Sequence, residues 1–556
     1  MGTDPRGTPH ERAPTLIRRI EGLTTIAVFA VVVLLLLPDL GGQNVWSKDE
    51  ARDGLVARDM VEQGSWLIPH IGGRVYPYKP PLFHWLVALV SPRGVTEWSL
   101  RLPSVLAAGG TAAVTFAIGS RLATPGTGLV AAAILVSSPA FVEWARMGRL
   151  EMLLVFWITL GAWSAMRWLE DERRRHVFVL GLALGFGCLT KGPVGLLPFG
   201  ALLLARFLPP RWSRRVVADL GIALAVAVAL PLAWLGLAAS ALPQIGSYVG
   251  AAIDVFADET RVSRARHALY AAEAIGVGFL PWTLLVPGAS IVLFRAGRGS
   301  WRLLLFPLLW AGLVLVAFTV FISPRAVHFL PLYPALALVV AWAWSTCSAG
   351  ERRWMGVPLA GAVIALLVFG LGTIVHPVSV AAHRGATEIG RGLGLTLAGI
   401  GAVAALGGLL LMRRRKPTEA LVVMGLAVLT VMLVLHVRVF TPLVNRAYPT
   451  REAAQRLAMA LPPSLPVAYL DRKFTTGLMF YLPQRPVEVA GVGSLRGMVD
   501  QPQLLALLPR SEMLFINSGV CLPTRPLREE SVSGDQYVLV DFKGASARWC
   551  RWPPGY

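Results

Sequence analysis

The chain has 556 residues, 55% of them hydrophobic and only 15% charged, and its formal net charge is +20. Soluble domains carry about 25% charged residues, so this composition excludes an ordinary soluble protein. Such a net charge would indicate nucleic-acid binding in a soluble chain, but here the arginines gather beside apolar runs, where they set membrane topology and contact anionic headgroups. We therefore predict a polytopic membrane protein that binds no nucleic acid.

Apolar runs long enough to cross a bilayer, which takes roughly 20 residues, recur between Leu23 and Val439. No cleavage site is obvious after the first run, so we interpret it as a retained helix rather than a signal peptide. The apolar stretch Pro81–Pro92 is too short to span, which favours an interfacial helix. We predict about thirteen transmembrane helices, at residues 22–41, 102–122, 127–145, 152–169, 177–190, 192–208, 216–238, 271–295, 303–322, 327–346, 355–376, 392–412 and 419–439.

Basic residues in the short connections orient the predicted spans. With the N-terminus in the cytoplasm, clusters such as Arg173–Arg175 and Arg413–Lys416 fall on the cytoplasmic side, as the positive-inside rule requires. The same orientation places the long loops 42–101 and 239–270 on the opposite side, together with the tail. We predict a multi-pass protein of the plasma (inner) membrane with a cytoplasmic N-terminus and an extracytoplasmic C-terminus.

The tail that follows the last apolar run has the pattern of a small mixed domain. Val467–Leu470, Met513–Ile516 and Tyr537–Val540 are short apolar runs that predict strands. Apolar residues recur at helical spacing over Arg451–Leu461, which predicts an amphipathic helix. The tail is therefore predicted to be an α/β domain.

These patterns divide the chain into two predicted domains. Residues 1–440 form a transmembrane domain that includes the first outer loop, and residues 441–556 form the extracytoplasmic α/β domain. Cys521 and Cys550 both fall in the second domain and could form a disulfide there, outside the reducing cytoplasm.

The first outer loop carries two groups of candidate functional residues. Asp49 and Glu50 follow the first span directly, at the membrane surface. Either Asp49 is the N-cap of an amphipathic helix, or it is a general base tuned by partial desolvation. Lys79 lies between Tyr78 and two prolines, which fix the backbone while the lysine offers a point charge suited to phosphate. Alternatively, Lys79 snorkels to anchor a short interfacial helix.

Further charges are predicted at the outer ends of other spans. Arg149 and Glu151 occupy a very short outer turn at a helix start, where an acidic residue suits the helix dipole and could also face the same cavity as Asp49. The other basic residues predicted on this side are Lys191, Arg261, His267, Arg325 and His328. Such a cluster suits a lipid phosphate, although bilayer headgroups would also attract it.

The sequence lacks the motifs that are typical of several other activities. The chain has no Walker-A sequence, no glycine-rich dinucleotide fingerprint and no zinc-ligand spacing. No predicted cytoplasmic segment is large enough to bind a nucleotide sugar. The energy for any transfer reaction must therefore arrive in a substrate that is already in the membrane.

The order and sidedness of the motifs resemble the GT-C membrane glycosyltransferases. The chain is most similar to the bacterial aminoarabinose transferases of lipid A and, more distantly, to the protein O-mannosyltransferases. The resemblance runs across nearly the whole chain, and its motifs are Asp49-Glu50, Tyr78-Lys79-Pro80-Pro81, Arg101-Leu102-Pro103-Ser104, Arg149-Leu150-Glu151, Leu189-Thr190-Lys191-Gly192-Pro193, Pro281-Trp282 and His328-Phe329-Leu330-Pro331-Leu332-Tyr333-Pro334.

The resemblance implies an inverting transfer of one sugar from a polyprenyl-phosphate carrier to an extracytoplasmic acceptor: a lipid A-like glycolipid, a glycan or a protein. By position, Asp49 resembles the family's catalytic aspartate, and Glu151 falls where the family has a second acidic residue. Lys79 and Arg261 resemble its phosphate-binding cations, to which we add Arg325. The residues predicted to support this site are Glu50, Tyr78, Arg149, Lys191, His267 and His328.

Two positions depart from the aminoarabinose transferases. Tyr78 replaces the glutamate that precedes Lys-Pro-Pro in the family, and Phe256 replaces a histidine five residues before the phosphate arginine. Both missing side chains belong to the family's proposed metal site, so we expect no metal or other cofactor here. The departures also leave the sugar and the acceptor open, and the oligomeric state is equally open.

A carrier that flips the polyprenyl-linked sugar is the alternative from another functional class. Its multi-span architecture and outer cationic cavity would look the same, but transporters place their sites near the bilayer midplane. The predicted spans are mostly free of charge, with the charged residues at their outer ends. This distribution favours chemistry at the membrane surface over translocation.

Overall fold

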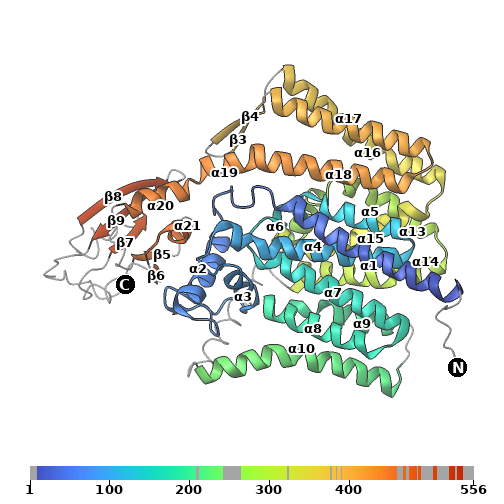
Figure 1. Cartoon of the computed structure of the whole chain (residues 1–556), viewed down its shortest axis with the longest axis horizontal. Helices are drawn as coiled ribbons and strands as arrows, with labels where there is room; N and C mark the ends of the chain where they lie inside the picture. Colours follow the sequence, from blue (N-terminus) through green and yellow to red (C-terminus); the bar gives the residue numbers. More distant parts are fainter. Residues whose placement is uncertain are drawn as a thin grey trace, which may run out of the picture.

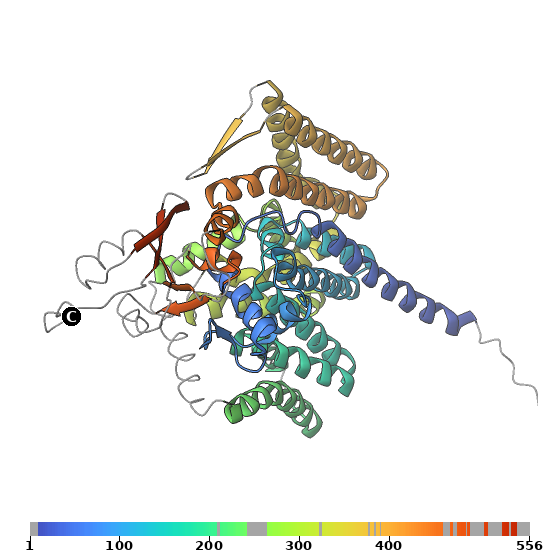
Figure 2. The same ribbon diagram turned by 60° about the vertical axis from the view of Figure 1, so that its left-hand side comes forward.

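The protein is a bundle of helices with a small β-sheet at one end (Figure 1). The helix α1 (Pro9–Leu36) extends away from that sheet, toward the opposite end of the bundle (Figure 2). The computed structural model describes residues 9–207, 212–241, 264–321, 325–375, 378–382, 385–389, 391–459, 467–470, 475–484, 486–489, 505–509, 525–532 and 535–541.

Helices account for most of the described residues. The remaining α-helices are α2 (Lys48–Gln63), α3 (Leu82–Leu89), α4 (Glu97–Leu122), α5 (Pro125–Val136), α6 (Pro139–Ala145), α7 (Leu150–Asp171), α8 (Arg174–Lys191), α9 (Leu197–Phe207), α10 (Arg214–Ala241), α12 (Arg264–Gly276), α13 (Val286–Arg295), α14 (Arg298–Val316), α15 (Tyr333–Thr346), α16 (Ala349–Val375), α17 (Arg391–Arg413), α18 (Pro417–Leu435), α19 (Thr441–Ala447), α20 (Thr450–Ala458) and α21 (Thr475–Tyr481). Shorter helical turns are η1 (Gly192–Leu196), η2 (Trp282–Leu285), η3 (Ala317–Phe321), η4 (Ala326–Leu332) and η5 (His436–Phe440).

Burial separates an inner group of helices from a lipid-facing periphery. The apolar window of the segment Ala326–Thr346, which contains η4 and α15, is 78% buried, whereas that of α16 is only 17% buried. The pair α16 and α17 lies at one edge of the bundle beside α18, and α10 lies at the opposite edge beside α8 (Figure 1). The core is therefore formed around α4, α5, α7 and α15.

Nine described helical segments are long and apolar enough to cross a membrane, and the pair α5 and α6, bent by 71°, makes a tenth. One of the nine, Arg174–Phe207, folds back on itself, because Arg206 near its end forms an ion pair with Glu172 just before its start. The turn lies at Gly192, whose φ of 67° is a conformation that glycine adopts readily. The architecture is thus a multi-pass helical one, and the total of about thirteen spans stays a prediction.

The structure interrupts two predicted spans: the one at residues 127–145, which bends by 71° between α5 and α6, and the one at residues 271–295. The helix α12 ends at Gly276, and helical structure resumes only with η2. Gly276 and Gly278 weaken the helix at this point, and Pro281 lacks the N–H needed to continue it. The prediction of one continuous helix was therefore wrong here.

The sheet at the end of the bundle, the tail sheet, has the strand order β6-β5-β7-β9-β8. Its strands are β5 (Val467–Leu470), β6 (Pro486–Val489), β7 (Leu505–Pro509), β8 (Arg525–Val532) and β9 (Asp535–Asp541). Strand β5 pairs in parallel with β6 and β7, and β9 pairs antiparallel with β7 and β8. Two further antiparallel pairs join β1 (His70–Ile71) to β2 (Arg74–Val75) and β3 (Val378–Ala382) to β4 (Gly385–Ile389).

The predictions for the tail fall partly on described residues. Two of the predicted strands coincide with β5 and β9, and the predicted amphipathic helix coincides with α20. The predicted strand Met513–Ile516 lies outside the described residues, as do Cys521 and Cys550.

The tail holds the segment that leads into α2. The backbone N–H of Asn44 donates to Oδ1 of Asn445 (2.7 Å), and the N–H of Val45 donates to the Tyr481 hydroxyl (2.8 Å). The Thr450 hydroxyl donates to the carbonyl of Val45 (3.1 Å). Buried backbone groups need such partners, so the tail determines the path of the first outer loop.

Helix α2 itself packs between the membrane helices and the tail. The Arg58 guanidinium donates to the carbonyls of Met479 (3.1 Å) and Leu482 (2.9 Å), which lie at the end of α21. Gly54 lies so close to the Phe480 ring that a Cβ at this position would be 2.5 Å from the ring. The absence of a side chain at Gly54 thus permits the contact between α2 and α21.

Replacing Gly54 by alanine is expected to force the two helices apart and to lower the free energy of unfolding by about 1–3 kcal/mol, the usual cost of overpacking. Thermal unfolding of the purified protein in detergent would measure the effect. Gly221→Ala is the matched control, because a Cβ there meets no atom within 4 Å. Equal melting temperatures for the two variants would contradict the close packing.

Candidate active site

The predicted site residues lie where the first outer loop meets the end of the bundle. Helix α2 begins after Ser47, whose extended backbone (φ −83°, ψ 130°) makes it the N-cap, without a side-chain capping bond. Asp49 lies in the first turn of α2, so the alternative in which Asp49 is the N-cap was wrong. The Asp49 carboxylate is therefore available for contacts with other elements.

Glu50 anchors the start of α2 through a buried ion pair with Arg101 of α4. Nε of Arg101 lies 2.8 Å from Oε1 of Glu50, and each side chain is 1% exposed. Arg101 also donates to the carbonyls of Leu40 and Gln43, each at 2.9 Å. Oε1 of Glu50 accepts a further bond from the N–H of Gly148 (2.9 Å). Glu50 and Arg101 together thus connect three chain segments.

Asp49 lies between two arginines from distant parts of the chain. Its Oδ2 is 3.0 Å from a guanidinium nitrogen of Arg149 and 3.0 Å from one of Arg325, while Arg52 is 3.8 Å from Oδ1. Burial opposes ionisation of Asp49, but the positive charges of Arg149, Lys79 and Arg325 outweigh it and hold its pKa well below the usual range. Asp49 is therefore a firmly ionised carboxylate in this state.

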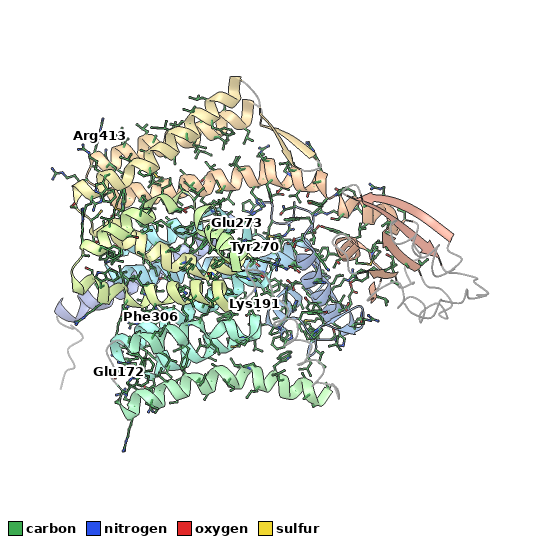
Figure 3. The ribbon with its side chains drawn as sticks, turned by 180° about the vertical axis from the view of Figure 1, so that it is seen from behind. Glu172, Lys191, Tyr270, Glu273, Phe306 and Arg413 are labelled. Atoms are coloured by element: carbon green, nitrogen blue, oxygen red, sulfur yellow. The ribbon has the colours of Figure 1, made fainter. Side chains whose placement is uncertain are left out.

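Arg149 extends the network to Glu151 and Lys191. Oε1 of Glu151 is 3.0 Å from Arg149 and 3.2 Å from Nζ of Lys191, and Oε2 has no hydrogen-bond partner among the described residues. Arg149 also lies over the Trp144 ring, 5.3 Å from its centroid. Lys191 lies at the end of α8 that is nearer the tail, whereas Glu172, just before the start of α8, lies at the opposite end (Figure 3). The charged network therefore gathers at the tail side of the bundle.

A second ion cluster contains Lys79 and two residues that the sequence analysis missed. Nζ of Lys79 lies 3.1 Å from Oδ2 of Asp53, and Nε2 of His84 lies 3.0 Å from Oδ1. Asp53 and His84 are completely buried. Asp53 lies four residues after Asp49 on α2, so both carboxylates belong to one helix face. That spacing was the one signal in the sequence that could have identified Asp53.

The structure describes Tyr78 and His328 among the remaining predicted residues. The Tyr78 side chain is 51% exposed, and its ring lies 5.1 Å from the ring of Tyr76. His328 is 9% exposed, with its ring 5.5 Å from Phe318. Arg261 and Phe256 lie outside the described residues, as does the side chain of His267.

The residues present do not fit the family's proposed zinc site. Tyr78 offers an exposed phenol in place of a carboxylate, and Phe256 has no donor atom. Within the part of the chain that the structure describes, no group of three or more His, Cys, Asp or Glu side chains is arranged to hold a metal ion.

A cavity of about 320 Å³ adjoins the two arginines that contact Asp49. Arg149 and Arg325 lie on its wall, together with Glu143 and Trp144 of α6 and Glu273 of α12. Glu273 is labelled in Figure 3, on α12 near the middle of the bundle. A cavity of this volume is at the lower end of the range for small-molecule sites.

Comparison with known proteins places this geometry in context. Residues 78–234 match a family model described as dolichyl-phosphate-mannose-protein mannosyltransferase. The undecaprenyl phosphate-alpha-4-amino-4-deoxy-L-arabinose arabinosyl transferase of Pectobacterium atrosepticum is 28% identical over 63% of this chain and 66% of its own length. The corresponding transferase 1 of Sodalis glossinidius is 30% identical over 63% of this chain and 65% of its own length. The match thus spans just under two thirds of these relatives.

A solved structure shares the fold of nearly the whole chain. The crystal structure of ArnT from Cupriavidus metallidurans bound to undecaprenyl phosphate has a TM-score of 0.75 and 18% identity, covering 94% of this chain and 98% of that one. These findings confirm the resemblance to GT-C membrane glycosyltransferases of the aminoarabinose transferase type. The chain is accordingly a multi-pass protein of the inner membrane.

Breaking the buried pair at the base of α2 is expected to destabilise the protein strongly. Glu50→Gln leaves the Arg101 charge buried without its partner, which typically costs about 3–5 kcal/mol. The double variant Glu50→Gln with Arg101→Met is expected to be more stable than Glu50→Gln alone, because it leaves no buried charge. Thermal unfolding in detergent would compare the variants, and a wild-type melting temperature for Glu50→Gln would contradict the anchoring role.

Proposed function

We propose that this chain transfers a sugar from a polyprenyl-phosphate donor to an extracytoplasmic acceptor, with inversion at the anomeric carbon. The observation that carries the proposal is the Asp49 carboxylate, 3.0 Å from both Arg149 and Arg325 at the outer end of the bundle. The named activity of the curated relatives and the undecaprenyl phosphate in the structural neighbour support it. The acceptor class is a lipid A-like glycolipid, a glycan or a protein.

The proposal includes an orientation and a division of the chain. Residues 1–440 form a transmembrane domain with about thirteen spans, and residues 441–556 form an extracytoplasmic domain around the tail sheet. The N-terminus is cytoplasmic, which agrees with the arginine-rich loops on that side. The charged network then faces the compartment where the acceptor is found.

In the proposed reaction, the bond between the anomeric carbon and the phosphate oxygen breaks, and its electron pair stays on the phosphate. An acceptor oxygen forms the new bond from the opposite face of the sugar and passes its proton to Asp49. Lys79 and Arg325, together with Arg261, neutralise the charge that builds on the departing phosphate. Stabilisation of this kind is commonly the largest contribution to catalysis.

Donor binding would activate Asp49. Paired with two arginines, Asp49 has a lowered pKa and is a weak base. Arg325 is 60% exposed, whereas Arg149 is 8% exposed, so Arg325 is the arginine that can turn toward an incoming phosphate. Losing Arg325 as a partner raises the pKa of Asp49, because one of the charges that lowers it has moved away. Asp49 would thus become a stronger base when donor is present.

Glu151 is proposed to organise the cations and the acceptor. Its Oε1 holds Arg149 and Lys191, and its unpaired Oε2 can accept a hydrogen bond from a substrate hydroxyl. The acceptor would approach through the cavity beside Arg149 and Arg325. The partners implied are therefore the lipid-linked donor, the acceptor and the surrounding membrane lipids.

Asp49→Ala is expected to lower the transfer rate about 10²–10⁴-fold, the usual cost of removing a general base. Mass spectrometry would compare envelope lipids and glycans from cells lacking the gene, complemented with the wild type or the variant. One sugar should be missing without the gene, the lipid-linked donor should accumulate, and Asp49→Ala should not restore the sugar. Full restoration by Asp49→Ala would remove the proposed base, and donor accumulating on the cytoplasmic face would favour a carrier instead.

Arg325→Ala is expected to raise the donor KM and lower kcat/KM about tenfold, since the arginine is largely exposed and its charge is partly screened. The acidic limb of the pH profile of kcat/KM should move to higher pH, because removing this cation raises the pKa of Asp49. Arg93→Ala is the control, because Arg93 is exposed in the same outer loop and outside the network. An unchanged pH profile and KM for Arg325→Ala would contradict the proposed role.

A further inference from the structure

Each described cation of the site is already paired with a carboxylate. Arg149 and Arg325 contact Asp49, and Arg149 and Lys191 contact Glu151. In the second ion cluster, Lys79 contacts Asp53. A phosphate that enters this site therefore meets cations that carboxylates already hold, rather than free positive charges.

Asp53 lowers the positive charge that a ligand phosphate meets. Five cations face three carboxylates in these ion pairs, which leaves an excess of two positive charges, and the excess would be three without Asp53; the cations are Arg52, Lys79, Arg149, Lys191 and Arg325. A polyprenyl phosphosugar is a phosphodiester and carries one negative charge. The polyprenyl phosphate left after transfer is a monoester, with a charge of about −1.5 to −2 at neutral pH. The charge of Asp53 therefore affects the lipid product more than the donor, because the product carries the larger negative charge.

Asp53 is the carboxylate that the proposed chemistry does not use. Its ion-pair partners are Lys79 and His84. Its side chain is completely buried, whereas Lys79 retains 18% exposure. Lys79 therefore lies between Asp53 and the side from which a ligand can arrive.

We propose that Asp53 is a positioning residue whose negative charge, acting through Lys79, limits how tightly the site holds the polyprenyl phosphate product and so speeds its release. This inference rests on the proposed role of Lys79 as a phosphate-binding cation. Product release limits turnover in many enzymes, so a counter-ion that weakens product binding raises the rate. The acceptor step itself does not involve Asp53.

Asparagine at this position isolates the effect of charge. The backbone around Lys79 is held independently, because Pro80 and Pro81 follow it and the N–H of Tyr76 donates to the carbonyl of Pro69 (2.7 Å). Oδ1 of Asp53 accepts from both Lys79 (3.2 Å) and His84 (3.0 Å), and an amide oxygen in its place keeps these two contacts, whereas the amide nitrogen in place of Oδ2 cannot accept the second bond from Lys79 (3.1 Å). Asp53→Asn therefore removes one buried negative charge at nearly constant shape.

The expected change is about tenfold tighter binding of a polyprenyl monophosphate to Asp53→Asn, equivalent to about 1.4 kcal/mol. The Asp53 carboxylate would be separated from a phosphate bound to Lys79 by about two ion-pair distances. At the effective dielectric constant of a partly buried site, one unit charge at that distance is sufficient for an effect of this size. In steady-state transfer, both kcat and the donor KM should fall, because slow product release lowers both. A merely structural role would not produce tighter binding.

The experiment is calorimetric titration of the purified full chain in detergent with farnesyl phosphate, a short polyprenyl monophosphate. Four proteins are compared: the wild type, Asp53→Asn, the double variant Asp53→Asn with Lys79→Met, and Glu62→Gln. Glu62 is the matched control, since it lies on the same helix, is 52% exposed and pairs only with Arg58 at 4.0 Å. Asp53→Asn should bind more tightly, the double variant more weakly, and Glu62→Gln like the wild type.

The outcomes separate this inference from the proposed function. Equal or weaker binding by a folded Asp53→Asn protein, while the double variant binds weakly, overturns the role of Asp53 alone. Wild-type affinity in the double variant shows that Lys79 does not bind the phosphate, and the proposed donor site then fails. If Asp53→Asn does not fold, Asp53→Ser removes the same charge with a smaller side chain and is subject to the same criteria.

Discussion

The buried ion pair between Glu50 and Arg101 is the contact on which the site geometry depends. Both side chains are almost completely buried, and a charge removed from water in this way is tolerated only when it is paired and hydrogen-bonded. The pair joins α2 to α4, and Glu50 also accepts from Gly148. Asp49 precedes Glu50 and Arg149 follows Gly148, so the pair brings the proposed base and its arginine together.

The tail completes this arrangement from the other side. Asn44 and Val45 form hydrogen bonds with residues about 400 positions later in the chain, and Arg58 caps the end of α21. These contacts bracket Asp49, because they lie before and after it along the same segment. A helix near the membrane surface would otherwise have few apolar contacts to keep it in place, so the tail has a structural function in the site.

Ion pairing between carboxylates and cations defines the site. Each described cation of the network is held by a carboxylate. In the proposed reaction, a ligand phosphate competes with these carboxylates for the same cations. The proposed role of Asp49 is proton transfer, and the proposed role of Asp53 is to weaken binding of the lipid product.

The sequence by itself determined the features that depend on local composition. Apolar runs of sufficient length predict membrane helices, because the backbone N–H and C=O groups of a segment in lipid must be paired, and a helix pairs them within the segment. Motif order and sidedness were enough to select Asp49, Glu151 and Arg325, which the structure brings into one network through Arg149. Their chemical roles stay predictions, since a position in a network does not establish a reaction.

Only the tertiary structure decided which charges are partners. The sequence analysis did not select Asp53 or His84, and they meet only because α2 packs against α3. The sequence predicted a supporting role for Glu50 but not its partner, which the fold places on α4 as Arg101. A charged residue in a sequence carries no information about its counter-ion, because ion pairs are made across segments that the fold alone brings together.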